Sequence, residues 1–357
     1  MNRFRFEKFE MKYGYFLPDD FKKFMAKFGG DCHFGSCNFD YVDNIINNLV
    51  RVYGKMDFHL FPFGSIGNGD YYCFYRYGEN KDDYFVGIWL HETKNFIILC
   101  KTFKAFIYRC ILDDYFSTIV SSDELGFEES VRLSKESIER CNILCSEYNF
   151  DMEKVKTIKN QIDYHRLMIE FDPKALQSLC YLGKHLINSN MEEAKEYLTR
   201  AKNICSFYTA PYYILGKHYL GKGINEGKTE ILKGIKTSLI LTGYSYWEED
   251  YMDIPQDVHR NLAFYLSERD ISFDNFIENA LVMGRDPYSL ILRLELAERL
   301  KKEGKYNEAL REYANAIYCC DDNIICKDIL REALNCTKEG GIMYLSKLIE
   351  QDIKLMK

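Results

Sequence analysis

The chain of 357 residues contains no long hydrophobic run. No segment approaches the roughly 20 consecutive apolar residues that a helix needs to cross a bilayer. The first 14 residues, MNRFRFEKFEMKYG, carry charges throughout and lack the apolar centre of a secretory leader. We therefore expect a cytoplasmic protein that does not contact a membrane.

The sequence also lacks the residue combinations on which common enzyme sites are built. The stretch Gly64–Gly69 is followed by Asp70 and an expected strand, whereas a phosphate-binding loop needs a lysine, a hydroxyl residue and then a helix. His91-Glu92 is not the zinc-protease motif, because Asn95 stands where the second histidine would be. No nucleophile with a recognisable base accompanies His91, so we expect it to make a structural hydrogen bond. These absences predict a protein that is not an enzyme and needs no cofactor.

No second cysteine or histidine pair stands at a spacing that would complete a zinc site. Tetrahedral zinc needs four ligands, and the one suitable cluster, Cys32, His33 and Cys37, offers three. The chain has 13 cysteines, an odd number spread over its whole length. This distribution indicates reduced thiols that serve as small apolar side chains. We predict no metal site.

Positive charge is scarce where a nucleic-acid binder would need it. The net charge is −7, and residues 1–115 carry 15 basic and 15 acidic side chains, so the excess of acid lies in residues 116–357. Affinity for phosphate depends on clustered lysine and arginine, so we do not expect direct binding of nucleic acid. A basic protein is the better match as a partner.

The N-terminal third does contain the signals of a helix followed by short strands. Pro18 and the acids Asp19 and Asp20 are typical of a helix start, and apolar residues at helical spacing lead to Gly29-Gly30. Farther on, aromatic and β-branched runs alternate with turn residues, which predicts an antiparallel meander. The expected strands cover residues 58–61, 70–77, 84–91 and 96–100. A helix with Phe103, Phe106, Ile107 and Cys110 on its buried side should follow.

This order of elements resembles the SUKH superfamily. The resemblance rests on FLPDDFKKFMAKFGG, FPFGSIGNGDYYCF, VGIWLHE and FIILCKTFKAFI, which follow one another over about residues 1–115. It implies an α+β domain of the kind found in fungal cell-wall assembly regulators and bacterial immunity proteins. The positions that belong to the family pattern are Gly64, Gly69, Asp70, Trp89, His91 and Glu92. We expect them to be structural, with the glycines supplying positive φ in a hairpin turn. The segment 31–53 departs from the pattern and resembles an insertion.

The second part of the chain repeats itself. The string LGKH occurs at Leu182–His185 and again at Leu215–His218, 33 residues later. The same offset relates two sets of small, large and small residues, Ala194, Leu198 and Ala201 to Gly227, Ile231 and Gly234. Later copies carry Leu262-Ala263 with Phe276, Ala280 and Met283, and Leu296-Ala297 with Tyr306, Ala309, Tyr313 and Ala316. The pattern resembles tetratricopeptide repeats, which implies closely packed helical hairpins.

Additional residues interrupt this period. Gly216 and Ala263 are 47 residues apart, roughly 13 more than one repeat, and the excess falls around residues 243–257. One interpretation is a solvated surface loop. The other is a recognition loop, because Trp and Tyr anchor interfaces and carboxylates attract a basic partner. The candidate partner-binding residues are Trp247, Glu248, Glu249, Asp250 and Tyr251, together with Asp82 and Asp83.

The sequence thus predicts an α+β domain, with helices packed on a mainly antiparallel sheet, followed by an all-α solenoid of tetratricopeptide-like repeats. The expected domains are 1–115, a helical connector or degenerate first repeat at 116–174, and the repeat array at 175–357. The segment Ile342–Met356 should be the capping helix. No glycine-, serine- or proline-rich linker separates Tyr108 from Phe127, so the joint between the modules should be stiff.

The resemblance implies a non-catalytic protein that binds another protein. We expect a bacterial immunity protein that neutralises a cognate toxin, with a basic domain, by occluding it. The alternative is a regulatory scaffold that recruits peptides or proteins through the repeat array. The fungal relatives embed the domain in long disordered flanks, and the absence of such flanks in this sequence favours the first function.

Overall fold

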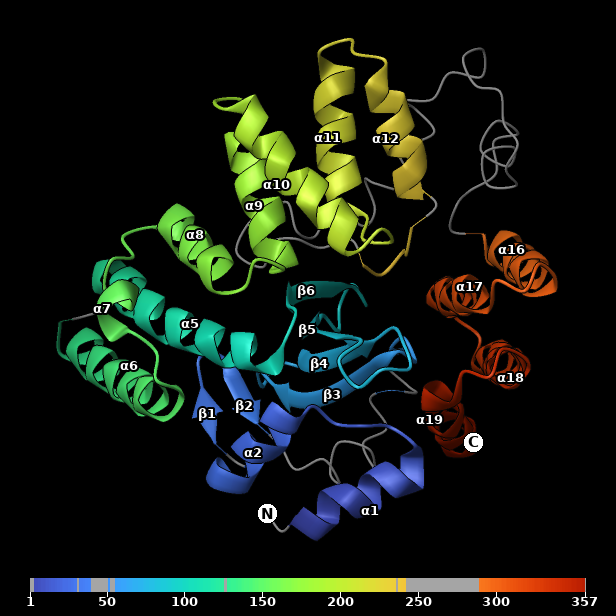
Figure 1. Ribbon diagram of the computed structural model, residues 1–357, viewed down its shortest axis with the longest axis horizontal. Helices are drawn as coiled ribbons and strands as arrows, with labels where there is room; N and C mark the ends of the chain where they lie inside the picture. The colour runs from blue at the N-terminus through green and yellow to red at the C-terminus, as the bar shows by residue number, and fades with distance from the viewer. Residues whose placement is uncertain are drawn as a thin grey trace.

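An antiparallel sheet of six strands lies at the centre of the computed structural model (Figure 1). The structure describes residues 3–30, 32–39, 51, 55–124, 127–235, 237–241 and 289–356. The strands, which pair in chain order, are β1 (His33–Phe34), β2 (Cys37–Phe39), β3 (Leu60–Ser65), β4 (Tyr71–Arg76), β5 (Tyr84–Trp89) and β6 (Phe96–Cys100). Part of the segment 31–53 belongs to the sheet, because β1 and β2 extend it beside β3, and the description of this segment as an insertion stays a prediction.

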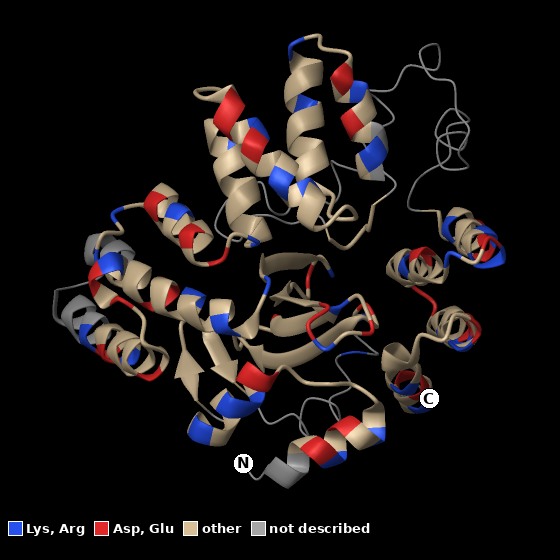
Figure 2. Ribbon diagram, in the orientation of Figure 1, with Lys and Arg blue, Asp and Glu red and all other residues tan. Residues whose placement is uncertain are grey.

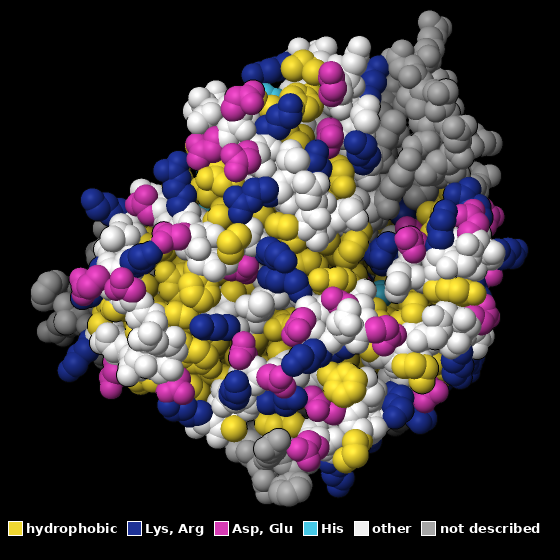
Figure 3. All heavy atoms as spheres, in the orientation of Figure 1, with side chains coloured by type: hydrophobic (Ala, Val, Ile, Leu, Met, Phe, Trp, Pro, Cys, Tyr) yellow, Lys and Arg dark blue, Asp and Glu magenta, His cyan; other side chains and the backbone are white. Residues whose placement is uncertain are grey.

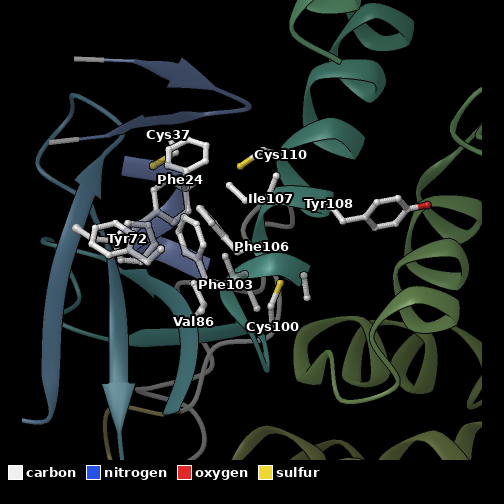
Figure 4. Close-up of a cluster of buried hydrophobic side chains, with 14 of the residues drawn as sticks. Phe24, Cys37, Tyr72, Val86, Cys100, Phe103, Phe106, Ile107, Tyr108 and Cys110 are labelled. Atoms are coloured by element: carbon white, nitrogen blue, oxygen red, sulfur yellow. The ribbon is translucent and has the colours of Figure 1, made fainter. Parts of the chain in front are cut away.

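Three helices pack against one face of this sheet: α1 (Arg3–Tyr13), α2 (Asp19–Phe28) and α5 (Phe103–Glu124). They enclose a core made largely of aromatic rings. Figure 4 shows Phe24, Phe103 and Phe106 in this core, between the sheet and α5. The prediction for the start of α5 is confirmed, since its four expected inward residues are all buried, namely Phe103, Phe106, Ile107 and Cys110.

Helix α2 begins and ends where the sequence predicts. Pro18 is its N-cap residue, and Asp19 and Asp20 stand in the first turn, where negative charge stabilises the positive end of the helix dipole. Gly29 ends the helix with a φ of 80°, and its N–H donates to the carbonyl of Met25. A residue other than glycine would be strained in this conformation.

Helix α1 was not predicted from the sequence. Phe6, Phe9 and Tyr13 recur at helical spacing and are buried on the aromatic core. The charged residues between them dominate the composition of this segment, so the three apolar positions give a weak signal. The helix is therefore stabilised mainly by the burial of these rings.

The other face of the sheet is covered by the helical part of the chain. Tyr75, Trp89 and Phe96 form a continuous apolar cluster with Leu179 and Leu182. Figure 2 shows that the strands carry almost no charged side chains, whereas the helices carry many. Strands that are buried on both faces lose the usual alternation of apolar and polar residues, and every residue of β5 is buried.

The helical part follows α5 as a series of helices. They are α6 (Phe127–Tyr148), α7 (Met152–Val155), α8 (Gln161–Phe171), α9 (Leu176–Leu186), α10 (Met191–Ile204), α11 (Ala210–Gly221), α12 (Glu226–Ile235), α16 (Leu290–Lys302), α17 (Tyr306–Tyr318), α18 (Asn323–Glu339) and α19 (Met343–Leu355). The predicted capping helix is confirmed as α19. The predicted unit at Leu262–Met283 lies outside the described residues.

The repeated small residues allow the paired helices to approach closely. A Cβ atom added to Gly183 in α9 would lie 2.5 Å from Leu198 Cγ in α10. The equivalent atom on Gly216 in α11 would lie 2.6 Å from Ile231 Cγ1 in α12. Both distances are too short for real carbon atoms, so each hairpin needs glycine where the branched residue of its partner helix packs.

Buried polar contacts join the two modules. Arg51, which precedes β3, forms a two-pronged ion pair with Asp352 of α19, with N···O distances of 3.1 and 2.8 Å. The guanidinium of Arg76 in β4 lies 5.3 Å from the ring centroids of both Tyr15 and Tyr344. The first domain and the end of the repeat array therefore pack against each other. The stiffness of the joint between Tyr108 and Phe127 stays a prediction.

The structure confirms the predicted fold class, an α+β domain followed by helical repeats. The boundaries at residues 115 and 174 stay predictions, and α5 passes through the first of them as one continuous helix. Among the described residues, no helix combines the length and apolar character that crossing a bilayer requires.

Candidate partner-binding surface

Two turns meet at one end of the sheet. The β3–β4 turn spans residues 66–70, and the β5–β6 turn spans residues 90–95. Tyr71 pairs with Trp89, and Trp89 pairs with Phe96, so both turns lie at the same end of the strands. We call these two turns the hairpin end. Four of the six family-pattern positions lie there: Gly69, Asp70, His91 and Glu92.

Asp70 and His91 hold the two turns together. One carboxylate oxygen of Asp70, Oδ1, accepts from the backbone N–H of His91 at 2.9 Å and lies 2.8 Å from His91 Nδ1. The Asp70 side chain is 7% exposed and that of His91 is 40% exposed. The predicted structural hydrogen bond of His91 is confirmed, and its partner is Asp70. The neighbouring carboxylate, Glu92, is exposed.

Glycine is required for two different reasons in and beside the β3–β4 turn. Gly67 and Gly69 have φ values of 97° and 108°, so the predicted positive φ is confirmed for the turn. The same prediction is wrong for Gly64, which lies in β3 beside an irregularity in the register with β4. A Cβ atom at Gly64 would lie 2.6 Å from Cys37 Sγ, so the close approach of β2 requires the glycine.

Trp89 is a structural residue of the core rather than of the surface. Its side chain is buried between the sheet and the helical array, in the cluster that contains Leu179. Its indole N–H has no hydrogen-bond partner in the part of the chain that the structure describes. Burial of the ring therefore outweighs the cost of one unpaired donor.

Asp82 and Asp83 lie at the opposite end of the sheet, in the β4–β5 turn. Asp83 Oδ2 accepts from the backbone N–H of Asn80 at 3.2 Å and from its side-chain amide at 2.9 Å, so this carboxylate stabilises its own turn. Asp82 is exposed, and its carbonyl accepts from Lys101. Asp82 and Asp83 thus lie away from the hairpin end.

The candidate loop residues Trp247, Glu248, Glu249, Asp250 and Tyr251 lie outside the described residues. The segment that leads to them, residues 237–241, is attached to the hairpin end. The N–H of Phe96 donates to the carbonyl of Ile240 at 2.7 Å, and Asn95 Nδ2 donates to the carbonyl of Leu239 at 3.3 Å. The N–H of Leu239 donates to Asn315 Oδ1 at 2.8 Å.

Sequence reasoning missed this attachment. The run Leu239–Leu241 is short and apolar, and it precedes Gly243. Such a run is a signal for a buried extended segment, but periodicity alone does not identify the strand beside which it lies.

The three residues weighed as metal ligands do not converge. His33 Nδ1 lies 2.8 Å from Asn38 Oδ1, and Cys37 is buried beneath Gly64. Burial raises the pKa of the Cys37 thiol well above its ordinary value, which disfavours the thiolate that a metal needs. Cys32 Sγ donates to the carbonyl of Gly29 at 3.6 Å.

Comparison with known proteins identifies the first domain. No curated protein matches the chain. The model of the SMI1 / KNR4 family (SUKH-1) matches residues 5–109, which contain α1, α2, the sheet and the start of α5. This range agrees with the domain expected over residues 1–115. The N-terminal part of this chain is therefore a SUKH-1 domain of the SMI1 / KNR4 family.

Proposed function

We propose that this protein is an immunity protein that neutralises a basic protein toxin by binding and occluding it, without catalysis. The SUKH-1 domain supports the general class, an immunity or regulatory protein. The observation that carries the proposal is the 2.7 Å hydrogen bond between Phe96 N–H and the Ile240 carbonyl. It attaches residues 237–241, which precede the candidate recognition loop in the sequence, to the hairpin end.

The length of the chain limits how far the loop residues can lie from this attachment. Trp247 follows Leu241 by six residues. A fully extended chain of that length spans at most about 22 Å. Glu248, Glu249 and Asp250 follow Leu241 by seven to nine residues, so the same reasoning allows them to lie at most about 32 Å from it.

Acidic side chains of the described residues lie at the same end. Glu92 is exposed, and Asp321, between α17 and α18, is 98% exposed. The hydrogen bond from Lys55 and the charges of Lys55 and Lys94 lower the pKa of Asp321, so it stays ionised near neutral pH. Exposed carboxylates suit a basic partner, because complementary charge steers association, and the Trp and Tyr in the sequence that follows Leu241 are residue types that anchor interfaces.

The alternative function, a scaffold that recruits peptides through the repeat array, finds less support. Leu179 and Leu182 of α9 pack on Tyr75 and Phe96 of the sheet. Apolar side chains of the array are therefore buried against the SUKH-1 domain of the same chain. A peptide would have to use the other faces of the helices, on which Figure 2 shows basic and acidic residues interspersed.

The test is recovery of the partner from native cells by the tagged full-length chain, followed by mass spectrometry. We expect one stoichiometric basic protein whose toxicity in a growth assay is abolished by co-expression of the chain. The double variant Trp247→Ala with Glu248→Lys should bind it about a hundredfold more weakly, as expected for loss of an interface anchor. Glu192→Lys, an exposed position on α10, is the matched control and should bind normally. Recovery of many unrelated proteins, unaffected by the double variant, would contradict the proposal and favour the scaffold.

A further inference from the structure

A second surface carries two partly buried aromatic rings, those of Phe150 and Phe171, next to the buried ring of Tyr108. Figure 3 shows hydrophobic side chains gathered on the surface over α5 to α8. A pocket of about 300 Å³ opens there, and Tyr108, Phe150 and Phe171 line it. We call these three residues the aromatic groove. Figure 4 shows Tyr108 pointing away from the core of the sheet, toward the helices on the other side of α5.

The end of helix α6 presents Phe150 to this groove. Asn149 has a φ of 54°, and the N–H of Phe150 donates back to the carbonyl of Cys145 at 3.0 Å. This geometry is a common way to end a helix, and asparagine tolerates the left-handed conformation better than most residues. The backbone thus fixes the position of the Phe150 ring.

The three rings form a rigid apolar floor. The Tyr108 and Phe171 rings stack with centroids 4.3 Å apart. Phe150 meets both rings edge-on, with centroids 5.1 Å from each. The floor is therefore already assembled, so a ligand that stacks on it does not have to order these rings.

Charged side chains line the pocket beside the floor. The carboxylates of Asp151 and Glu170 are exposed, and Lys154, which also lines the pocket, pairs with Glu170. Burial raises the pKa of Tyr108, and the negative charges of Glu170 and Asp151 raise it further. Lys104 Nζ already lies 5.7 Å from the centroid of the Phe150 ring, which shows that a cation is accommodated on one face of the floor.

We propose that the aromatic groove binds an arginine or lysine side chain from a basic segment of a protein partner, through stacking on the rings and attraction to Asp151 and Glu170. A cation above an aromatic face is stabilised by the ring quadrupole, and arginine also stacks with its planar guanidinium. The choice of a protein partner rests on the proposed function. The groove would be a contact separate from the hairpin end.

The test uses a short fluorescein-labelled peptide of alternating arginine and serine, titrated with the full-length chain and followed by fluorescence anisotropy. Peptides with lysine or glutamate in place of arginine are the ligand controls. We expect binding in the order arginine, lysine, glutamate. Phe150→Leu keeps an apolar side chain but removes the ring, and it should weaken arginine-peptide binding about tenfold.

A second variant separates a loss of binding from a loss of the folded structure. Glu170 is 60% exposed and pairs with Lys154, which is itself exposed, so Glu170→Lys should leave the melting temperature nearly unchanged. It should weaken the arginine peptide several-fold at low salt. Glu192→Lys on α10 makes the same charge change elsewhere on the surface and should have little effect. Equal binding by the wild type, Phe150→Leu and Glu170→Lys, or an equal loss with Glu192→Lys, would overturn the inference.

The two proposals fail separately. If the partner recovered from native cells binds Phe150→Leu and the wild type equally, the groove is not its contact, while neutralisation still stands. If the arginine peptide binds the groove but no toxin is recovered, the neutralisation proposal fails and the groove proposal survives.

Discussion

The SUKH-1 core and the repeat array are packed by opposite means. In the first, large rings fill the space between helices and sheet, and Phe103 alone has ring contacts with Phe21, Phe24, Phe39 and Phe63. In the second, glycine and alanine let one branched residue of the neighbouring helix approach the backbone. The first should therefore be sensitive to lost volume and the second to added volume.

The largest effect is expected from removing a ring of the SUKH-1 core. Phe103→Ala should lower the free energy of unfolding by about 3–5 kcal/mol, because the fully buried ring leaves a cavity among its neighbours. Urea denaturation measures the change. Phe16→Ala is the control, since Phe16 is 52% exposed, and it should cost far less. Similar losses for both variants would show that the aromatic core is not close-packed.

Breaking the buried ion pair between the modules should cost nearly as much. Asp352→Asn leaves the Arg51 guanidinium buried without its counter-charge, and we expect a loss of about 3 kcal/mol. The unfolding transition should stay single, because the modules share packed cores. Asp328→Asn removes a carboxylate from an exposed ion pair on α18 and is the matched control. Two separate transitions in the wild type would contradict the description of the modules as packed against each other.

A larger side chain at a close contact between two helices of the array tests whether the array is sensitive to added volume. Gly183→Ala places a methyl group 2.5 Å from Leu198 Cγ and should cost about 1–3 kcal/mol despite the higher helix propensity of alanine. In Gly221→Ala the new methyl group meets no atom within 4 Å, so that variant should be neutral or more stable by up to about 1 kcal/mol. Combining Gly183→Ala with Leu198→Ala should cost less than the sum of the two single changes. Additive losses would contradict the assigned contact.

The smallest effect concerns pH at the junction of α8 and α9. Burial, helped by the charges of Arg109 and His185, holds the pKa of His165 well below its ordinary value. In the unfolded chain His165 is protonated near pH 6.5, whereas in the folded chain it stays neutral. Because the unfolded state binds the additional proton, the free energy of unfolding decreases as the pH falls. Between pH 7 and pH 5.5 the loss should be about 1 kcal/mol. His165→Gln should show a weaker dependence on pH in denaturation experiments, and an unchanged dependence would contradict this assignment.

Local signals were sufficient for much of the fold. Pro18 with two following acids predicted the start of α2, and the offset between Gly183 and Gly216 predicted two equivalent hairpins. Candidate sites were harder to predict. Asp83 looked like a free surface acid but stabilises its own turn, because an adjacent Asn80 supplies two donors. The aromatic groove was missed because Tyr108, Phe150 and Phe171 lie on three separate segments of the chain.

The sequence by itself determined the elements and their type: the SUKH-1 pattern, the helical repeats and the glycines with positive φ in the β3–β4 turn. These depend on neighbours along the chain, where the spacing of apolar residues and the allowed values of φ act directly. Only the tertiary structure decided that the array covers the second face of the sheet and that residues 237–241 lie beside β6. Such contacts join residues that are far apart in the chain, and apolar burial is not directional, so periodicity shows that a face is buried but does not identify what covers it.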